Sequence, residues 1–163
     1  MTDKNIEIKE LHMDDLELLI SMRMEVLSNV FSAERKMISD KEWEDIRKEN
    51  EKYYNEEIEK GSHIACAIYL SGELAGCGGV CLYREMPSPD NYSGKCAYLM
   101  NIYVRKKYRR QGLAKEICNH LINKARNRGA DKIYLESSTM AVGLYQSIGF
   151  ENMDGYMKLN NIK

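Results

Sequence analysis

The residues best suited to chemistry lie in a basic stretch that leads into a predicted helix. Between Arg105 and Lys132 the chain carries ten basic and two acidic residues, a net charge of +8. Arg109, Arg110 and Gly112 stand directly before the apolar positions of that helix. A helix N-terminus offers unpaired N–H groups and the positive end of the helix dipole, and a glycine lets a phosphate approach the backbone. Because basic residues at a helix N-terminus are unfavourable without an anion, we favour an anion site over the alternative, a solvated basic loop.

Metal and disulfide chemistry are not expected. The five cysteines form no C-x-x-C pair, and the three histidines stand at no ligand spacing from them. We therefore predict no metal, and reduced thiols that pack as small core residues. Reduced thiols favour the cytoplasm, and residues 1–10 lack the apolar stretch of a secretory signal. No apolar run approaches the roughly 20 residues that cross a bilayer.

The elements that must position the basic stretch follow from hydrophobic periodicity and turn residues. A capping box, Ser39-x-x-Glu42, begins the second helix, and Gly149 ends the last one. In chain order we predict a strand around 6–8, helices over 14–29 and 39–61, a hairpin of strands 63–70 and 73–83, a proline-containing loop over 84–95, a strand over 96–104, a helix from the turn 112–114 to 128, a strand over 132–137, a helix over 141–148 and a last strand over 156–159.

This order predicts one α/β domain over residues 1–163, with a mixed sheet. The crossover from strand 96–104 through the long helix to strand 132–137 has the length of a β-α-β unit, so these two strands should be parallel. The total charge of −1 excludes a globally basic nucleic-acid coat protein. That total arises by cancellation, because residues 1–60 carry ten basic and seventeen acidic residues, a net charge of −7.

Two segments give the chain a resemblance to a known family. Arg109-x-x-Gly112-x-Ala114, which follows an apolar strand in "NIYVRKKYRRQGLA", resembles the acyl-CoA signature of the GNAT N-acetyltransferases, (Gln/Arg)-x-x-Gly-x-(Gly/Ala). The later "GLYQSIGF" resembles the Leu-Tyr-x-x-x-Gly-Phe element of the same family. The close match covers about 98–150. It implies a mixed, mostly antiparallel sheet whose one central parallel strand pair is splayed apart, flanked by helices.

The resemblance also implies a cosubstrate, acetyl-CoA, and residues that hold it. The pantetheine arm would pair with the backbone of one strand, and the pyrophosphate would bind N–H groups of the following turn with two arginines alongside. Tyr145 would lie beside the thioester sulfur, and the acceptor amine would enter from the opposite side, near the loop 84–95 and the N-terminal helices. The residues so implied are Ile102, Tyr103, Val104, Arg109, Arg110, Gln111, Gly112, Leu113 and Ala114.

Acetyl transfer to an amine requires a base and benefits from an acid. An amine attacks the thioester carbonyl and a thiolate leaves; deprotonating an ordinary ammonium at pH 7 costs roughly 4.6 kcal/mol. Tyr145 fits the acid, since a phenol donates a proton without being ionised first; the alternative is a core aromatic. The base is open: Glu136 is the only carboxylate in the two central strands, and a structural role is equally open for it. Glu85 and Asp90 are further possibilities.

The sequence departs from the family at two places and leaves other functions open. Met100 and Asn101 stand where many members have a glutamate, and Ser138 where many have an asparagine. One alternative is an acyl-CoA-binding regulator without turnover; another is a nucleic-acid-binding module that uses the basic run 105–110. We expect a primary amine acceptor, possibly cationic given the acidic residues 1–60, no nucleic-acid or membrane partner, and a monomer or homodimer.

Overall fold

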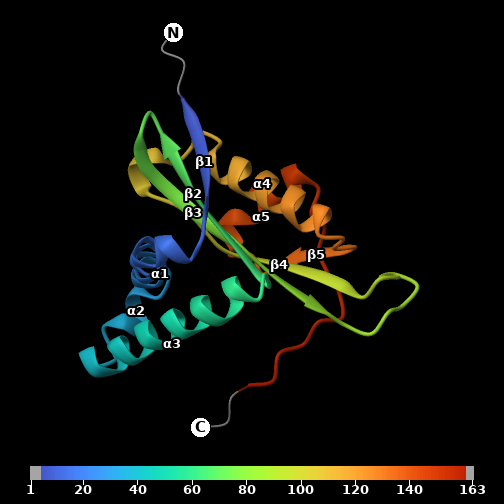
Figure 1. Ribbon diagram of the computed structural model, residues 1–163, viewed down its shortest axis with the longest axis horizontal. Coiled ribbons are helices and arrows are strands. Elements are labelled where there is room, and N and C mark those ends of the chain that lie inside the picture. Colours follow the sequence, from blue (N-terminus) through green and yellow to red (C-terminus); the bar gives the residue numbers. More distant parts are fainter. Residues whose placement is uncertain (1–4, 161–163) are drawn as a thin grey trace.

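A five-stranded sheet with helices on both faces organises the protein in the computed structural model, which describes residues 5–160 (Figure 1). Residues 1–4 and 161–163 of the predicted domain lie outside this range. The elements in chain order are β1 (Ile6–Leu11), η1 (Met13–Asp15), α1 (Leu16–Val30), α2 (Ser32–Arg35), α3 (Asp40–Glu59), β2 (His63–Leu70), β3 (Glu73–Arg84), β4 (Lys95–Val104), η2 (Lys106–Tyr108), α4 (Leu113–Asn127), β5 (Lys132–Leu135), η3 (Thr139–Ala141) and α5 (Val142–Ile148).

The sheet confirms the predicted fold class. Its strands lie in the order β1–β2–β3–β4–β5, and neighbours are antiparallel except for the last pair. Strands β4 and β5 are parallel and are joined by α4, as the length of the crossover predicts. The sheet is therefore mixed, mostly antiparallel, with one parallel pair.

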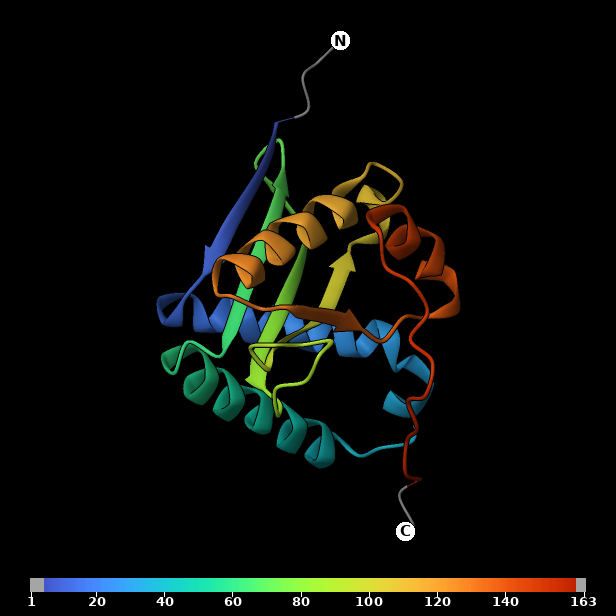
Figure 2. The ribbon, with the colours of Figure 1, turned by 90° about the vertical axis from the view of Figure 1, so that its right-hand side faces the viewer.

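Each face of the sheet has its own core. Figures 1 and 2 show α1 and α3 on one face and α4 and α5 on the other. Successive residues of a strand point to opposite faces, so β2 serves both. Its Ile64, Cys66 and Ile68 pack in the core beneath α4, whereas Ala65 and Ala67 pack with residues of α1 and α3. Strand β2 is buried almost throughout for this reason.

Glycines in β3 let its neighbours come close. A Cβ on Gly76 would lie 2.2 Å from the carbonyl oxygen of Tyr103, and one on Gly78 would lie 2.4 Å from Cγ2 of Ile117. Helix α4 can therefore seat its apolar face directly on the sheet, where Leu113 and Ile117 are fully buried. The buried Leu113 thereby fixes the N-terminus of α4 beside β4.

The cysteines behave as the predicted core residues. All five are free, four are buried, and Cys81 is half-buried. Burial raises the pKa of both Cys66 and Cys77 to about 12, so these thiols are protonated at neutral pH.

The structure corrects three details of the predicted elements. The last strand, 156–159, is wrong: this segment makes no ladder and is exposed, and Met157 is 98% accessible. Tyr156 reaches β5 through its side chain, with its ring centroid 6.3 Å from that of Tyr134, so alternation of apolar residues did not bring the backbones into register. Strand β5 ends at Leu135, two residues early, and the short helix α2 was not predicted.

Candidate active site

The parallel strands pair briefly and then separate. The last paired residues are Leu99 and Leu135; β5 ends there, whereas β4 continues to Val104. Asn101 has a positive φ of 59°, and the register with β3 shifts between Cys77 and Gly79, as in a β-bulge. Over 100–104, no described strand pairs with the edge of β4 that faces β5. This edge includes the predicted pantetheine-binding residues.

The loop after β4 delivers the chain to an open helix N-terminus. Gly112 caps α4 with φ of 81°, and a Cβ placed on it would meet no atom within 4 Å. The first bond of the helix runs from the N–H of Glu116 to the carbonyl of Gly112, so the N–H groups of Leu113 and Ala114 have no acceptor within the helix. This backbone cradle has the form that binds a phosphate group, and it fits the predicted pyrophosphate site.

The two signature arginines differ in their surroundings. Nε of Arg109 donates to the carbonyl oxygen of Val104 at 2.9 Å, which ties the loop to the end of β4 and occupies that carbonyl. Arg110 is exposed, has φ of 62° and makes no ion pair among the described residues. Arg109 thus shapes the cradle, and Arg110 presents a guanidinium beside it.

Three of the other eight basic residues of 105–132 form ion pairs with acidic residues of other elements. The guanidinium of Arg105 pairs with Glu25 at 2.8 Å and donates to the carbonyl of Leu74 at 3.0 Å. Lys124 pairs with Glu10 at 2.6 Å, and Lys132 pairs with Glu85 at 3.2 Å. The net charge of +8 over residues 105–132 is therefore not all available to a single ligand.

Tyr145 lies where α5 packs against α4. Its ring meets that of Phe150 edge-on, with centroids 5.9 Å apart, and it belongs to the core beneath α4. Burial, with lesser contributions from Cys118 and Tyr98, raises the pKa of Tyr145 to about 12. The hydroxyl is therefore protonated at neutral pH, as an acid must be.

Tyr145 and Glu136 line one cavity of about 970 Å³, together with Tyr98 and the segment after α5. Glu136 lies one residue beyond β5 and is exposed, so it does not stand within the central strand 132–137 as the sequence predicts. The cavity is open to solvent on one side and is bordered by β5, α5 and residues 149–153 and 156–158. The two predicted catalytic residues are thus brought to the same space, whereas the residues of the phosphate cradle do not line it.

Hydrogen bonds and an ion pair make the other two base candidates weaker proton acceptors than ordinary carboxylates. Glu85 accepts from Nδ2 of Asn91 at 3.1 Å and pairs with Lys132, and these contacts lower the pKa of its carboxyl group. Asp90 accepts from the hydroxyl of Ser88 at 2.5 Å, which lowers its pKa likewise. Neither lines the cavity of Tyr145.

Sequence reasoning missed three tyrosines of this cavity, Tyr98, Tyr134 and Tyr156, of which the first two pack against each other. Tyr98 and Tyr134 are register partners on β4 and β5, and their ring centroids lie 5.0 Å apart. The hydroxyl of Tyr134 also meets that of Tyr83 in a short hydrogen bond. Each tyrosine stands in a predicted strand, but only the register of the parallel pair places Tyr98 and Tyr134 side by side.

The position that departs from the family has a partner of its own. Asn101 accepts through Oδ1 from Nη1 of Arg23 at 2.9 Å, and Nε of Arg23 donates to Oδ1 of Asn50 at 3.0 Å. This network joins α1 and α3 to the bulge in β4. The strand therefore carries an anchoring amide at the point of separation.

No described helix is long and apolar enough to cross a membrane. Residues 5–160 also contain no group of three or more His, Cys, Asp and Glu side chains that could hold a metal ion.

Comparison with known proteins agrees with this geometry. Residues 26–150 match the model of the acetyltransferase (GNAT) family. The [ribosomal protein bS18]-alanine N-acetyltransferase of Escherichia coli (strain K12) is 42% identical over 57 residues, which are 33% of this chain and 38% of that protein. The N-alpha-acetyltransferase 50 of Danio rerio is 30% identical over 106 residues, 63% of this chain and 59% of that protein.

The fold has solved counterparts over nearly all of its length. A predicted acetyltransferase from Clostridium acetobutylicum, crystallised with acetyl-CoA, superposes with a TM-score of 0.80 at 23% identity, covering 96% of each chain. The curated relatives share only part of their length with this chain, whereas the family match covers most of the chain and contains the cradle, the separated strands and Tyr145. The chain therefore belongs to the GNAT acetyltransferase family.

Proposed function

We propose that the protein is an acetyl-CoA-dependent N-acetyltransferase that acetylates a primary amine of a small-molecule acceptor, with residues 1–163 acting as one domain. The observation that carries this proposal is the open N-terminus of α4, which follows the part of β4 that no longer pairs with β5. The helix N-terminus suits the phosphate end of a phosphopantetheine arm, and the free edge of β4 next to it suits the amide groups of the same arm. The five free thiols suit the reducing conditions of the cytoplasm.

The phosphate cradle and the strand edge would hold the cosubstrate. The N–H groups of 111–114 would bind the pyrophosphate, with Arg110 beside them and Arg109 holding the loop in shape. The backbone of 102–104 would pair with the pantetheine amides, except at the carbonyl of Val104, which Arg109 occupies. When bound, acetyl-CoA supplies an activated acetyl group.

Tyr145 would keep its hydroxyl proton for the departing sulfur. Its raised pKa, about 12, keeps the proton in place at neutral pH. Glu136, on the rim of the same cavity, would accept the proton of the amine directly or through water. Both groups would then act at one space, with the acceptor amine entering opposite the cradle.

The test is thiol release from acetyl-CoA against a panel of amines that includes diamines, aminoglycosides, amino acids and peptide N-termini. Tyr145→Phe should lower kcat about 10²-fold, because a positioned general acid is typically worth 10²–10⁴. Tyr69→Phe, a tyrosine of β2 far from α5, serves as the matched control and should keep the full rate. Since Tyr145 loses its proton only as pH rises through about 12, kcat of the wild type should show no decline from this residue below pH 10.

Two outcomes would contradict parts of the proposal. A Tyr145→Phe variant with full kcat across pH would remove the acid assignment. CoA binding without thiol release with any amine of the panel would identify an acyl-CoA-binding regulator instead.

A further inference from the structure

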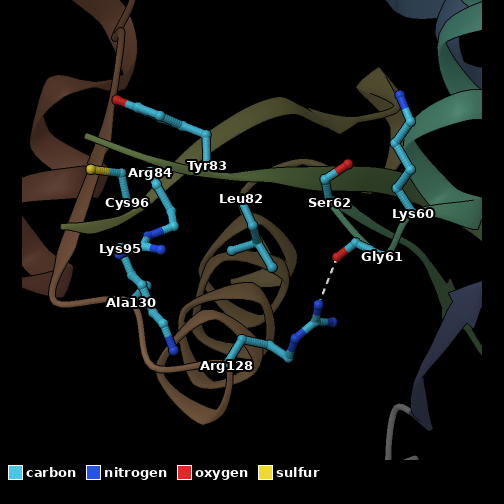
Figure 3. Close-up of a pocket in the computed structure, with 10 residues that line it drawn as sticks. All are labelled: Lys60, Gly61, Ser62, Leu82, Tyr83, Arg84, Lys95, Cys96, Arg128 and Ala130. Carbon is cyan, nitrogen blue, oxygen red and sulfur yellow. Dashed lines mark hydrogen bonds between the residues drawn. The ribbon is translucent and has the colours of Figure 1, made fainter. Parts of the chain in front are cut away.

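A second cavity lies at the other end of α4. It has a volume of about 330 Å³ and is formed where α3, β3, β4 and α4 meet (Figure 3). Helix α4 has 15 residues, so this cavity and Gly112 are separated by roughly 22 Å along the helix. It is distinct from the phosphate cradle and from the cavity of Tyr145. The residues that line it are Lys60, Gly61, Ser62, Leu82, Tyr83, Arg84, Lys95, Cys96, Arg128 and Ala130.

Four cationic side chains from four elements border this cavity. Lys60 follows α3, Arg84 ends β3, Lys95 begins β4 and Arg128 follows α4. Their sequence positions are far apart, so the fold alone gathers them. Figure 3 shows Arg84 and Lys95 together on one side of the cavity; the guanidinium of Arg128 points to Gly61 on the opposite side, and Lys60 points away.

Two of these cations are neighbours across adjacent strands. Arg84 and Lys95 are direct register partners on antiparallel strands. Like charges in this arrangement repel and destabilise a sheet. Neither side chain forms an ion pair with any residue of the described range, 5–160. An anion bound between them would relieve the repulsion.

The surroundings leave the cavity net positive. Nη2 of Arg128 donates to the carbonyl of Gly61 at 2.8 Å, which holds the guanidinium at the rim. The nearby carboxylates are engaged: Glu57 pairs with Lys60 at 3.3 Å, and Asp131 accepts the backbone N–H of Ser93 at 3.2 Å. Asp131 offsets part of the charge of Lys95, and the guanidinium groups of Arg84 and Arg128 remain.

We propose that this cavity binds a small phosphate-bearing anion. Arginine and lysine together suit a phosphate, because a guanidinium can bind two of its oxygens while an ammonium adds a compact charge. The volume is at the lower end of the range for small-molecule sites, and buried Ala130 and half-buried Leu82 give it an apolar floor. A nucleic acid requires a basic stripe that extends along the surface, and a single small cavity does not provide one.

The experiment is calorimetric titration of inorganic pyrophosphate into protein saturated with CoA, so that the cradle at Gly112 is already filled. We expect one further pyrophosphate per chain, and about tenfold weaker binding in the double variant Arg84→Gln/Lys95→Gln, since two charge-assisted contacts are lost. The matched control is Lys48→Gln/Lys52→Gln, which removes the same charge from the exposed face of α3 and should leave the affinity unchanged.

Three results would overturn the inference. One is the absence of pyrophosphate binding to the CoA-saturated wild type at millimolar concentrations. Another is equal affinity in Arg84→Gln/Lys95→Gln and wild type, which would place the anion elsewhere. The third is a single-stranded oligonucleotide that binds the wild type, binds Arg84→Gln/Lys95→Gln more weakly, and is not displaced by pyrophosphate. That result would make this surface a nucleic-acid site. Circular dichroism of the double variant, compared with wild type, verifies that its fold is intact.

Discussion

The two ends of α4 are both electropositive, but they are built differently. At Gly112 the donors are backbone N–H groups at a helix N-terminus, with Arg109 bonded to the strand that precedes them. At the other end, near Arg128, the helix dipole is negative, and the positive charge comes from side chains of neighbouring elements alone. Backbone donors are fixed by the fold, whereas exposed cations are held by few contacts. We therefore expect the site at Gly112 to discriminate strongly among anions, and the site near Arg128 to accept anions of varied shape.

The largest effect expected from this comparison is at Gly112. Gly112→Val should weaken CoA binding about 10²-fold, because a β-branched residue disfavours the positive φ of 81° and its side chain enters the space above the cradle. Gly72 provides a matched control: it has φ of 82°, and a Cβ on it would also meet nothing within 4 Å. Gly72→Val should cost similar folding stability, measured by thermal unfolding, and leave the CoA affinity intact. Equal CoA affinity in both variants would show that the cradle is not the phosphate site.

Salt should separate the two ends. Raising the ionic strength from about 0.05 to 0.5 M should weaken pyrophosphate binding near Arg84 about tenfold, since exposed charges are screened over the Debye length. CoA binding at Gly112 should weaken only about threefold, because backbone dipoles and strand pairing contribute to it. Titrations of both ligands across the salt series measure the two slopes. Parallel slopes would mean that the cradle, too, relies on side-chain charge.

The smallest effect concerns single arginines. Arg110→Gln should weaken CoA binding about fivefold, as expected for one exposed guanidinium on a phosphate, and leave pyrophosphate binding to CoA-saturated protein unchanged. Arg84→Gln should do the reverse. Fluorescence or calorimetric titration gives the affinity of each variant for each of the two ligands, four values in all. If either variant weakened the binding of both ligands, the two sites would not be electrostatically independent.

Much of this site follows from local sequence. The signature Arg109-x-x-Gly112-x-Ala114, the apolar strand before it and the amphipathic helix after it lie within one short stretch, so periodicity and turn residues locate them without knowledge of the fold. The parallel pairing of β4 and β5 follows from the length of the connection between them. Tyr145 stands in the helix where the family resemblance expects it, and its burial agrees with a protonated hydroxyl.

The failures share a cause, which is that pairing partners are distant in the chain. The strand over 156–159 was inferred from alternation, but a strand needs a partner edge in register, and that segment has none in the described structure. Glu136 was counted within a strand because nothing local marks the end of β5 at Leu135. Arg105 counts toward the basic run 105–110 in the sequence, but in the structure it pairs with Glu25 of α1.

By itself, the sequence determined most of the element order, the family and the turn at Gly112 that opens α4, because each depends on residues close together along the chain. Only the tertiary structure decided which charges remain for ligands. It pairs Arg105 with Glu25 and Lys124 with Glu10, and it leaves Arg84 opposite Lys95. The physical reason is that an ion pair depends on distance in space, and strand register and helix docking set that distance for residues tens of positions apart.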